Sequence, residues 1–349
     1  SDSRKVGSIG LKTVLYYLCT TAFAITIGLI GGNLFKGMFP TTATTDLSYE
    51  AAETTSFMDT LVNIFPSNFI DPLYSASMLQ VIVMAILIGF AIILVGKEAQ
   101  PVITGVNSLN TVFMKCMEMI LKLSPIGVFC LLCPVIAENG ATIIGSLAMV
   151  LLTAYICYIV HAAVVYSIAV KTMGGMSPIK FFQGMLPAIM FAFSSASSVG
   201  TLPINMECTQ KLGASKEVSS FVLPLGATIN MDGAAITITI MTLAAANTLG
   251  MQVSVPAAIL LSIMSALGAC GASGVAGGSL LLIPMACSLF GISNDIAMQV
   301  VGVGFIIGVI QDSVETALNS AGDVEFAATA EYHQWLKEGK PLPAFMGGK

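Results

Sequence analysis

The chain has 349 residues, of which 56% are hydrophobic and only 9% are charged, and its formal net charge is -5. This composition lies far outside that of a soluble globular domain and predicts an all-α polytopic membrane protein. The small negative charge leaves no basic stripe, so a nucleic-acid-binding protein is excluded.

Long apolar runs predict helices that cross the bilayer, because about 20 apolar residues span the hydrocarbon as a helix. The first span is expected at residues 6–35, and a polar, acidic connection follows at 39–77. A second apolar run covers 79–95, and an amphipathic helix then passes through Lys115. Residues 143–170 contain no Asp, Glu, Lys or Arg and predict a further span.

Basic residues gather at the amino end of the first span, at Arg4, Lys5 and Lys12, whereas the long connection after that span is acidic. By the positive-inside rule, the amino end is expected on the cytoplasmic side. The carboxyl end is expected on the same side, and the membrane is expected to be the plasma (inner) membrane. The amino end also lacks the pattern of a cleaved signal peptide.

Two segments rich in serine and glycine interrupt the apolar sequence, "FSSASSVGTLPINM" at 193–206 and "GACGASGVAGGSLLLIP" at 268–284. Irregular backbone cannot face lipid, because each unsatisfied N–H or C=O group costs several kcal/mol there. We therefore expect both segments to form re-entrant helical hairpins. A polar helix follows each of them, and such a duplication is typical of a transporter with inverted repeats and a binding site near the bilayer midplane.

The last polar helix has five polar side chains on one face, spaced i, i+3, i+4, i+7 and i+11: Asp312, Glu315, Thr316, Asn319 and Asp323. A charge at the centre of a membrane helix costs at least about 2.5–3.5 kcal/mol, and no Lys or Arg occurs between Lys216 and Lys337. The neutralising charges are therefore expected from outside the chain, as sodium ions and a substrate ammonium group, since oxygen ligands favour a hard cation. We interpret Glu325 and Glu331 as solvated charges.

The motif "NMDG" at 230–233 places an acid in the other polar helix. We expect a break in that helix, where Gly233 relieves the backbone, carbonyl groups near Asn230 are freed, and Asp232 binds a cation. Three hydroxyl residues of the first span lie at i, i+3 and i+4 and form a patch suited to share that ion: Tyr17, Thr20 and Thr21.

Four stretches resemble the signature regions of the dicarboxylate/amino acid:cation (sodium) symporter family: "SSVGTLPINM", "LPLGATINMDG", "GASGVAGG" and "DSVETALNSAGD". The resemblance covers essentially the whole chain and is closest to the sodium:serine/threonine symporter branch. It implies an elevator mechanism, in which a transport domain of two hairpins and two broken helices slides against a trimeric scaffold. The first span resembles the family's third membrane helix, so the first two family helices are expected to be missing from this chain.

The resemblance also implies a division of the chain. Transport-core elements are expected at 6–36 and 143–330, scaffold-like elements at 55–135, and a cytoplasmic tail at 331–349. The partners implied are a small amino acid, sodium, the lipid bilayer and, in a full-length protein, two further copies of the chain. Sodium ions as coupling ions are the only cofactors expected.

The resemblance further implies a substrate site. The ammonium group is expected on Asp312, and the α-carboxylate on Asn319 and the backbone of Ser198. The full substrate set is Ser197, Ser198, Val275, Gly278, Asp312, Glu315, Thr316 and Asn319.

Three sodium sites are implied in the same way. The first combines Asp323 with backbone oxygens of three other residues: Gly226, Asn230 and Asn319. The second lies between Thr228, Met231 and Ala269. The third is formed by five residues: Tyr17, Thr20, Thr21, Asn230 and Asp232.

The residue one helical turn after Asp312, at position 315, indicates which class of substrate is carried. Relatives that transport acidic substrates are expected to have an arginine there, which pairs with the distal carboxylate. Glu315 occupies the position in this chain and would repel a second carboxylate. We therefore expect sodium-coupled import of small neutral amino acids such as serine and threonine. A sodium- or proton-coupled symporter of acidic amino acids or C4-dicarboxylates remains the alternative.

The motif "GASG" at 271–274 suggests a different class of protein, because it has the GxSG pattern of an intramembrane serine protease. Such an enzyme would need Ser273 as the nucleophile and His161 as its base. It would leave the acids of the polar helices unexplained, so we expect a transporter rather than an enzyme. A channel is a third possibility, which saturable, substrate-coupled sodium flux would exclude.

Overall fold

The computed structural model of the chain describes the following residues, together with a few single positions between them: 3–39, 65–74, 78–121, 142–251, 253–271, 277–288 and 294–341. Within these ranges all regular secondary structure is helical, which confirms the all-α prediction.

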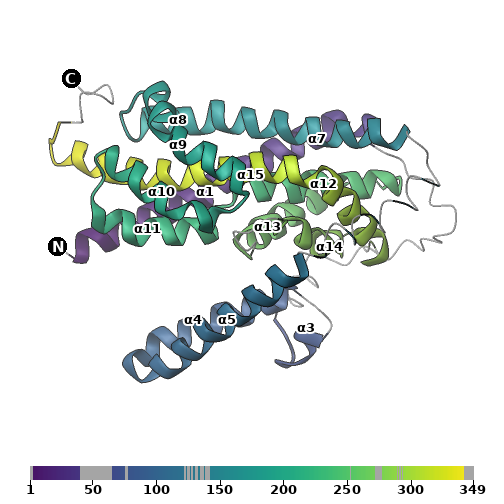
Figure 1. The fold of residues 1–349 in the computed structure, drawn as a ribbon, viewed down its shortest axis with the longest axis horizontal. Coiled ribbons are helices and arrows are strands. Elements are labelled where there is room, and N and C mark those ends of the chain that lie inside the picture. Colours follow the sequence, from purple (N-terminus) through teal and green to yellow (C-terminus); the bar gives the residue numbers. More distant parts are fainter. Residues whose placement is uncertain are drawn as a thin grey trace. The chain divides into compact units, whose positions relative to one another are not determined.

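The helices group into two units, one formed by residues 1–46 and 142–349 and the other by residues 47–141. The second unit contains the blue helices of Figure 1: α3 (Asp71–Tyr74), α4 (Met78–Val95), the short 3-10 helix η2 (Gly96–Ala99) and α5 (Gln100–Leu121). The first unit holds all of the candidate site residues that the structure describes.

In the first unit, the helices pack around the long helix α15 (Asn294–Lys337), drawn in yellow in Figure 1. The helix α1 (Ser3–Phe35) packs on both α15 and α12 (Asp232–Thr248). The helix α7 (Thr142–Val160) continues through a π-helical segment, η3 (His161–Tyr166), into α8 (Ser167–Thr172). The remaining elements are η1 (Lys36–Met38), α9 (Pro178–Ser195), α10 (Ser198–Lys211), α11 (Lys216–Ile229), α13 (Val255–Gly271), η4 (Leu280–Leu282) and α14 (Ile283–Ser288).

Several stretches of the described chain are long and apolar enough to cross a membrane. There are four of them: Ser8–Met38, Val83–Phe113, Ala148–Thr172 and Lys216–Asn247. They support the expected multi-pass integral membrane protein. The stretch over α11 and α12 is almost entirely buried inside the fold, whereas the others expose large apolar side chains such as Phe23, Ile93 and Ile159.

The first serine-rich segment is the tip of a helix pair, α9 and α10, which pack against each other and against α15. The turn between them is short because Ala196 adopts a left-handed conformation, with φ of 47°. The side chain of Ser197 then caps α10 by accepting a hydrogen bond from the backbone N–H of Gly200, at 3.0 Å.

The expected break lies between α11 and α12. Asn230 and Met231 leave the helical conformation, with φ/ψ of -95°/82° and -122°/55°. A Cβ atom added at Gly233 would lie 2.8 Å from the carbonyl oxygen of Glu315. Glycine at 233 therefore allows the start of α12 to approach α15 closely.

The second glycine-rich segment begins in the last turn of α13 and ends in α14, and these two helices pack against each other. Residues 272–276, at the centre of that segment, lie outside the described residues. A second broken helix was expected, but α15 runs unbroken over 44 residues, so this prediction is wrong. No proline occurs between Asn294 and Lys337, and the polar side chains of α15 take hydrogen bonds from other elements, so no backbone group has to be freed.

Candidate functional site

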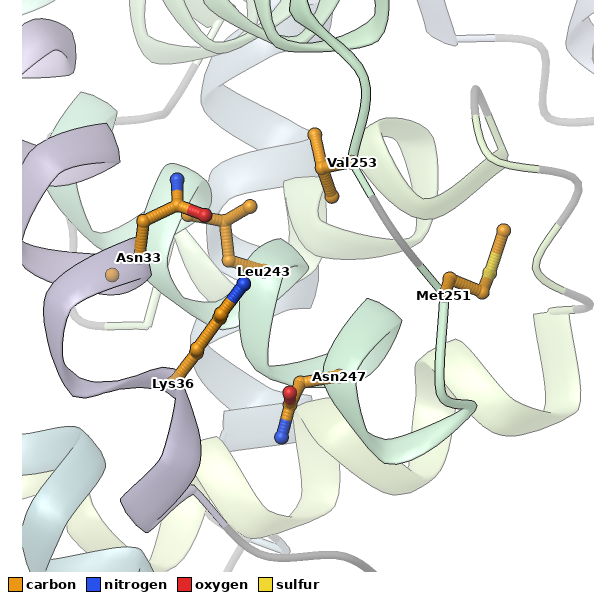
Figure 2. Close-up of a pocket in the computed structure, with 7 residues that line it drawn as sticks. Asn33, Lys36, Leu243, Asn247, Met251 and Val253 are labelled. Atoms are coloured by element: carbon orange, nitrogen blue, oxygen red, sulfur yellow. The ribbon is translucent and has the colours of Figure 1, made fainter.

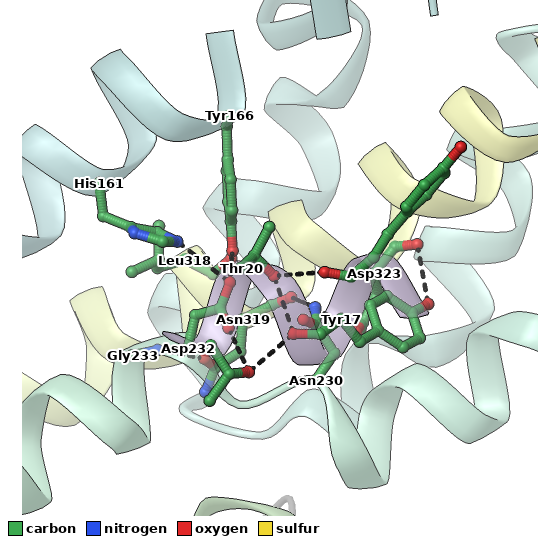
Figure 3. Close-up of polar contacts among 12 residues, drawn as sticks. Tyr17, Thr20, His161, Tyr166, Asn230, Asp232, Gly233, Leu318, Asn319 and Asp323 are labelled. Carbon is green, nitrogen blue, oxygen red and sulfur yellow. Dashed lines mark hydrogen bonds and ion pairs between the residues drawn. The ribbon is translucent and has the colours of Figure 1, made fainter. Parts of the chain in front are cut away.

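Asp232, the first residue of α12, is fully buried and is held by three side-chain hydrogen bonds (Figure 3). Thr21 of α1 donates from its hydroxyl to Oδ1 at 2.8 Å. Tyr166 donates from its hydroxyl to Oδ2 at 3.0 Å, and Nε2 of His161 lies 3.1 Å from the same oxygen. The structure thus brings the α1 hydroxyl patch to Asp232, and it adds two partners from the π-helical segment.

The other two hydroxyl residues of α1, Tyr17 and Thr20, are also buried. The Tyr17 hydroxyl lies 3.4 Å from the backbone oxygen of Asp323 and donates toward it. Thr20 donates to the backbone oxygen of Tyr17 at 3.0 Å. The hydroxyls of Tyr17 and Thr21 therefore lie where α1 meets α15 and the helix break, whereas the hydroxyl of Thr20 bonds within α1.

Asn230 and Asp323 lie side by side at the break (Figure 3). Nδ2 of Asn230 donates to Oδ1 of Asp323 at 3.0 Å and to the backbone oxygen of Asn319 at 3.3 Å. Both residues are fully buried, yet Oδ1 of Asn230 and Oδ2 of Asp323 have no hydrogen-bond partner. Two buried acceptor oxygens without donors form a set suited to a cation.

Gly226 lies directly against Tyr17 and Asp323 in this part of the site. A Cβ atom added there would lie 2.5 Å from the hydroxyl oxygen of Tyr17 and 2.7 Å from Oδ1 of Asp323. A side chain at 226 would therefore collide with the Tyr17 hydroxyl and with the Asp323 carboxylate, whose other oxygen is unpaired, and glycine avoids both collisions.

Asn319 ties α15 to the start of α12. Its Oδ1 accepts a hydrogen bond from the backbone N–H of Gly233 at 2.8 Å, which satisfies one of the amides that the first turn of a helix leaves unpaired. Its Nδ2 points to the sulfur of Met231 at 3.3 Å. The structure therefore brings Asn319, Asn230, Met231 and Asp323 together at the break.

Asp312 and Glu315 form a second acidic group, one turn apart on α15, and are 7% and 4% exposed. Oδ2 of Asp312 accepts from the backbone N–H of Gly277 at 2.8 Å. Oε2 of Glu315 accepts from the hydroxyls of Thr237 and Ser279, at 2.5 and 3.0 Å.

Glu315 receives a further hydrogen bond at the same oxygen from Nε2 of Gln311. The Gln311 amide also donates to the hydroxyls of Tyr158 and Thr237, at 3.1 and 2.9 Å. The two hydroxyls lie 2.5 Å apart. A buried chain of neutral donors thus surrounds Glu315, and no cationic side chain contributes to it among the described contacts.

The other expected substrate residues come from three elements: α10, the turn before η4 and α15. Ser198 begins α10 and is buried, and Ser197 caps that helix. Gly278 is buried in the turn before η4, and Thr316 is buried on α15. Val275 lies outside the described residues.

The expected second ion site is not assembled among the described contacts. Thr228 is exposed, and its hydroxyl donates to the backbone oxygen of Leu225 at 2.8 Å, within its own helix. Ala269 is buried in α13, and no described contact joins it or Thr228 to Met231.

The sequence interpretation missed the contributions of α7 and η3. Tyr158, His161 and Tyr166 are polar side chains on an otherwise apolar helix, and polar groups in a membrane span are typically functional. His161 and Tyr166 are five residues apart, a spacing that would place them about 140° apart around a regular α-helix, and the π-helical turn at 161–166 shifts the register by about one residue. That shift is what lets His161 and Tyr166 contact the same oxygen of Asp232.

The interpretation of Glu325 and Glu331 as solvated charges is wrong. Glu325 is fully buried on α15. Glu331 is 5% exposed, and its Oε2 accepts a hydrogen bond from the backbone N–H of Ser215 at 2.9 Å. Because Ser215 caps α11, Glu331 ties the start of that helix to α15. The tail boundary expected at 331 also falls inside α15, which continues to Lys337.

The protease alternative requires His161 to act on Ser273. In the structure, His161 is fully buried against Asp232, and Ser273 lies outside the described residues. The partner of His161 is therefore the acid that the alternative left unexplained.

A cavity of about 60 Å³ lies elsewhere in the first unit, at the carboxyl ends of α1 and α12 (Figure 2). Its lining residues are Gly32, Asn33, Lys36, Leu243, Asn247, Met251 and Val253. None of them belongs to the substrate or ion sets, so this cavity has no part in the candidate site.

Comparison with known proteins identifies one family and several named relatives. The profile of the sodium:dicarboxylate symporter family matches residues 1–332. The serine/threonine transporter SstT of Bifidobacterium adolescentis is 47% identical over 342 residues, which are 97% of this chain and 78% of that protein. Proteins of the same name from Streptococcus thermophilus and Streptococcus agalactiae are 39% and 41% identical, over 97% and 95% of this chain and 84% and 82% of theirs.

The Gly226→Ala variant tests whether Asn230 and Asp323 bind a cation at the helix break. The added methyl group would collide with Tyr17 and Asp323 and displace the Asp323 carboxylate. If the strain of about 1–3 kcal/mol that such overpacking causes falls on the ion-bound state, the ion affinity drops by about 5- to 150-fold. We expect the sodium concentration that gives half-maximal thermal stabilisation of the purified protein to rise accordingly. Gly28→Ala is the matched control, because its Cβ would meet only ordinary contacts, at 3.4–3.5 Å. Equal sodium responses in the two variants would contradict the assignment.

Proposed function

Since the chain belongs to the sodium:dicarboxylate symporter family, we propose that it couples the import of small neutral amino acids, serine and threonine above all, to sodium ions. The named relatives are serine/threonine transporters, and the similarity extends over nearly all of this chain. A transporter, rather than a protease, also accounts for acids that lie buried in an apolar protein.

The observation that carries the proposal is the pair of unpaired acceptors at the helix break. Oδ1 of Asn230 and Oδ2 of Asp323 are buried without donors, and no Lys or Arg occurs between Lys216 and Lys337. A sodium ion bound there would satisfy both oxygens and balance the Asp323 charge. Backbone oxygens of Gly226, Asn230 and Asn319 would complete its coordination.

Two further ions belong to the proposal. One is bound by Asp232 with Asn230 and the hydroxyl patch of α1, a placement that the contact between Thr21 and Asp232 supports. The other lies between Thr228, Met231 and Ala269 and rests on the family resemblance alone. His161 and Tyr166 would orient the Asp232 carboxylate as hydrogen-bond donors, in the way that outer partners orient metal-binding carboxylates.

The substrate is proposed to lie between α15, the tip of the α9–α10 pair and the turn that precedes η4. Asp312 would bind its ammonium group, and Asn319 with the backbone at Ser198 its α-carboxylate. Ser197, Thr316, Gly278 and Val275 would complete the pocket. The position of Glu315, buried one turn after Asp312, favours a neutral side chain on the substrate, because a second carboxylate would meet an acid without a cation.

The transport cycle is proposed to be of the elevator type. The first unit contains the α9–α10 pair, the broken α11–α12 helix and α15. In the proposal these elements form the mobile transport domain. The second unit would belong to a trimeric scaffold. The two hairpins would be re-entrant, the first opening toward the cytoplasm and the second toward the outside, and both ends of the chain would be cytoplasmic at the inner membrane.

Uptake into proteoliposomes tests the proposal. With radiolabelled serine, threonine, alanine, aspartate and succinate, we expect saturable uptake of serine and threonine that requires an inward sodium gradient. Asp312→Asn is expected to abolish serine binding while some sodium binding remains. Uptake of aspartate or succinate in preference to serine, or serine uptake without a sodium gradient, would contradict the proposal.

The Glu315→Arg variant tests the proposed selectivity. An arginine at 315 can pair with a distal carboxylate through two hydrogen bonds. We expect aspartate affinity to rise by about tenfold or more and serine affinity to fall, because an attractive charge replaces a repulsive one. Competition of each amino acid against labelled serine in wild type and variant measures the change. An unchanged preference for serine with no aspartate binding would show that residue 315 does not select the substrate.

A further inference from the structure

One turn of the chain supplies hydrogen-bond donors to both acids of the substrate site. The backbone N–H of Gly277 donates to Oδ2 of Asp312 at 2.8 Å, and the hydroxyl of Ser279 donates to Oε2 of Glu315 at 3.0 Å. Ser279 is 2% exposed, so this contact is buried. The turn between residues 277 and 279 therefore occupies the acceptors that the substrate would use.

The two donors match the chemistry of the proposed substrate. Serine and threonine carry an ammonium N–H and, on the adjacent carbon, a hydroxyl group. Asp312 and Glu315 lie at i and i+3, so their side chains are neighbours on one face of α15. A hydroxyl amino acid bound to this face would present the same pair of donors, an N–H group to Asp312 and an O–H group to Glu315.

The remaining donors to Glu315 come from elements other than this turn. Thr237 lies on α12, and Gln311 lies on α15 itself, one turn before Glu315. Tyr158 of α7 supports both of them through its hydroxyl group. These contacts would hold the carboxylate in place when Ser279 leaves it, so that an acceptor position already exists for another hydroxyl group.

We propose that Glu315 accepts the β-hydroxyl of the substrate at the position where it now accepts the hydroxyl of Ser279. Ser279 is then an intramolecular competitor of serine and threonine, and Thr237 and Gln311 are positioning residues for the Glu315 carboxylate. This inference rests on the proposed function and extends it, since it names the group that separates hydroxyl amino acids from alanine.

The competition has a definite consequence for selectivity. Alanine brings no hydroxyl, so in its complex Glu315 depends on the protein for donors, whereas serine supplies one itself. Removal of the Ser279 hydroxyl leaves a buried carboxylate one donor short, and such a deficit is costly. The deficit favours serine over alanine, because serine alone can fill it.

Isothermal titration of serine and alanine in sodium, with purified wild type and Ser279→Ala, tests the inference. We expect the ratio of the alanine to the serine dissociation constant to rise by about tenfold in the variant, the effect of one hydrogen bond to a charged group. Threonine and valine, which differ by a hydroxyl in place of a methyl group, are expected to follow the same trend.

Two controls accompany this variant. Ser279→Thr keeps the hydroxyl, and Ser288→Ala removes an exposed serine whose hydroxyl bonds to the backbone oxygen of Met285. Both are expected to keep the wild-type ratio. Should Ser279→Ala not fold, Ser279→Cys, a weaker donor of similar size, is expected to shift the ratio in the same direction by a smaller factor.

The outcomes distinguish a failure of the inference about Ser279 from a failure of the proposed function. A ratio that falls or stays unchanged in Ser279→Ala, while wild type binds serine with sodium, would overturn the competition and leave the proposed function standing. A wild-type protein that binds neither serine nor threonine in sodium would instead overturn the proposed function.

Discussion

Buried carboxylates that no Lys or Arg contacts in the described part of the chain are the constraint on which the rest of this structure depends. Asp232, Asp312, Glu315 and Asp323 are buried in one unit of the fold, in a part of the sequence that contains no Lys or Arg. Neutral donors hold some of their oxygens, as Thr237 and Gln311 hold Glu315. Neutral donors do not balance the charge, which leaves that role to ions and substrate.

The helix break is the device that gathers these groups. Interruption of α11 and α12 at Asn230 and Met231 frees backbone groups in the protein interior, and α15 passes alongside with Asn319 and Asp323. Glycine at 226 and 233 lets α1 and α15 approach the break within contact distance. The same geometry therefore explains why an apolar chain tolerates an interrupted helix and why its acids converge there.

Much of the site could be predicted from sequence periodicity. The spacing of Asp312, Asn319 and Asp323 requires a common helix face, and "NMDG" marked the break, because both are local properties of the chain. The partners of those residues depend on tertiary packing, so His161 and Ser279 were not identified as contacts of Asp232 and Glu315. Glu331 was misread because a charge near a helix end gives no sign in sequence that it caps another helix.

The dependence of serine affinity on sodium concentration tests the central claim most directly. If external cations balance the buried acids, the serine dissociation constant should fall steeply as sodium replaces choline at constant ionic strength, with a slope of at least one sodium ion per serine bound. A serine dissociation constant that is the same in sodium and in choline would contradict the account.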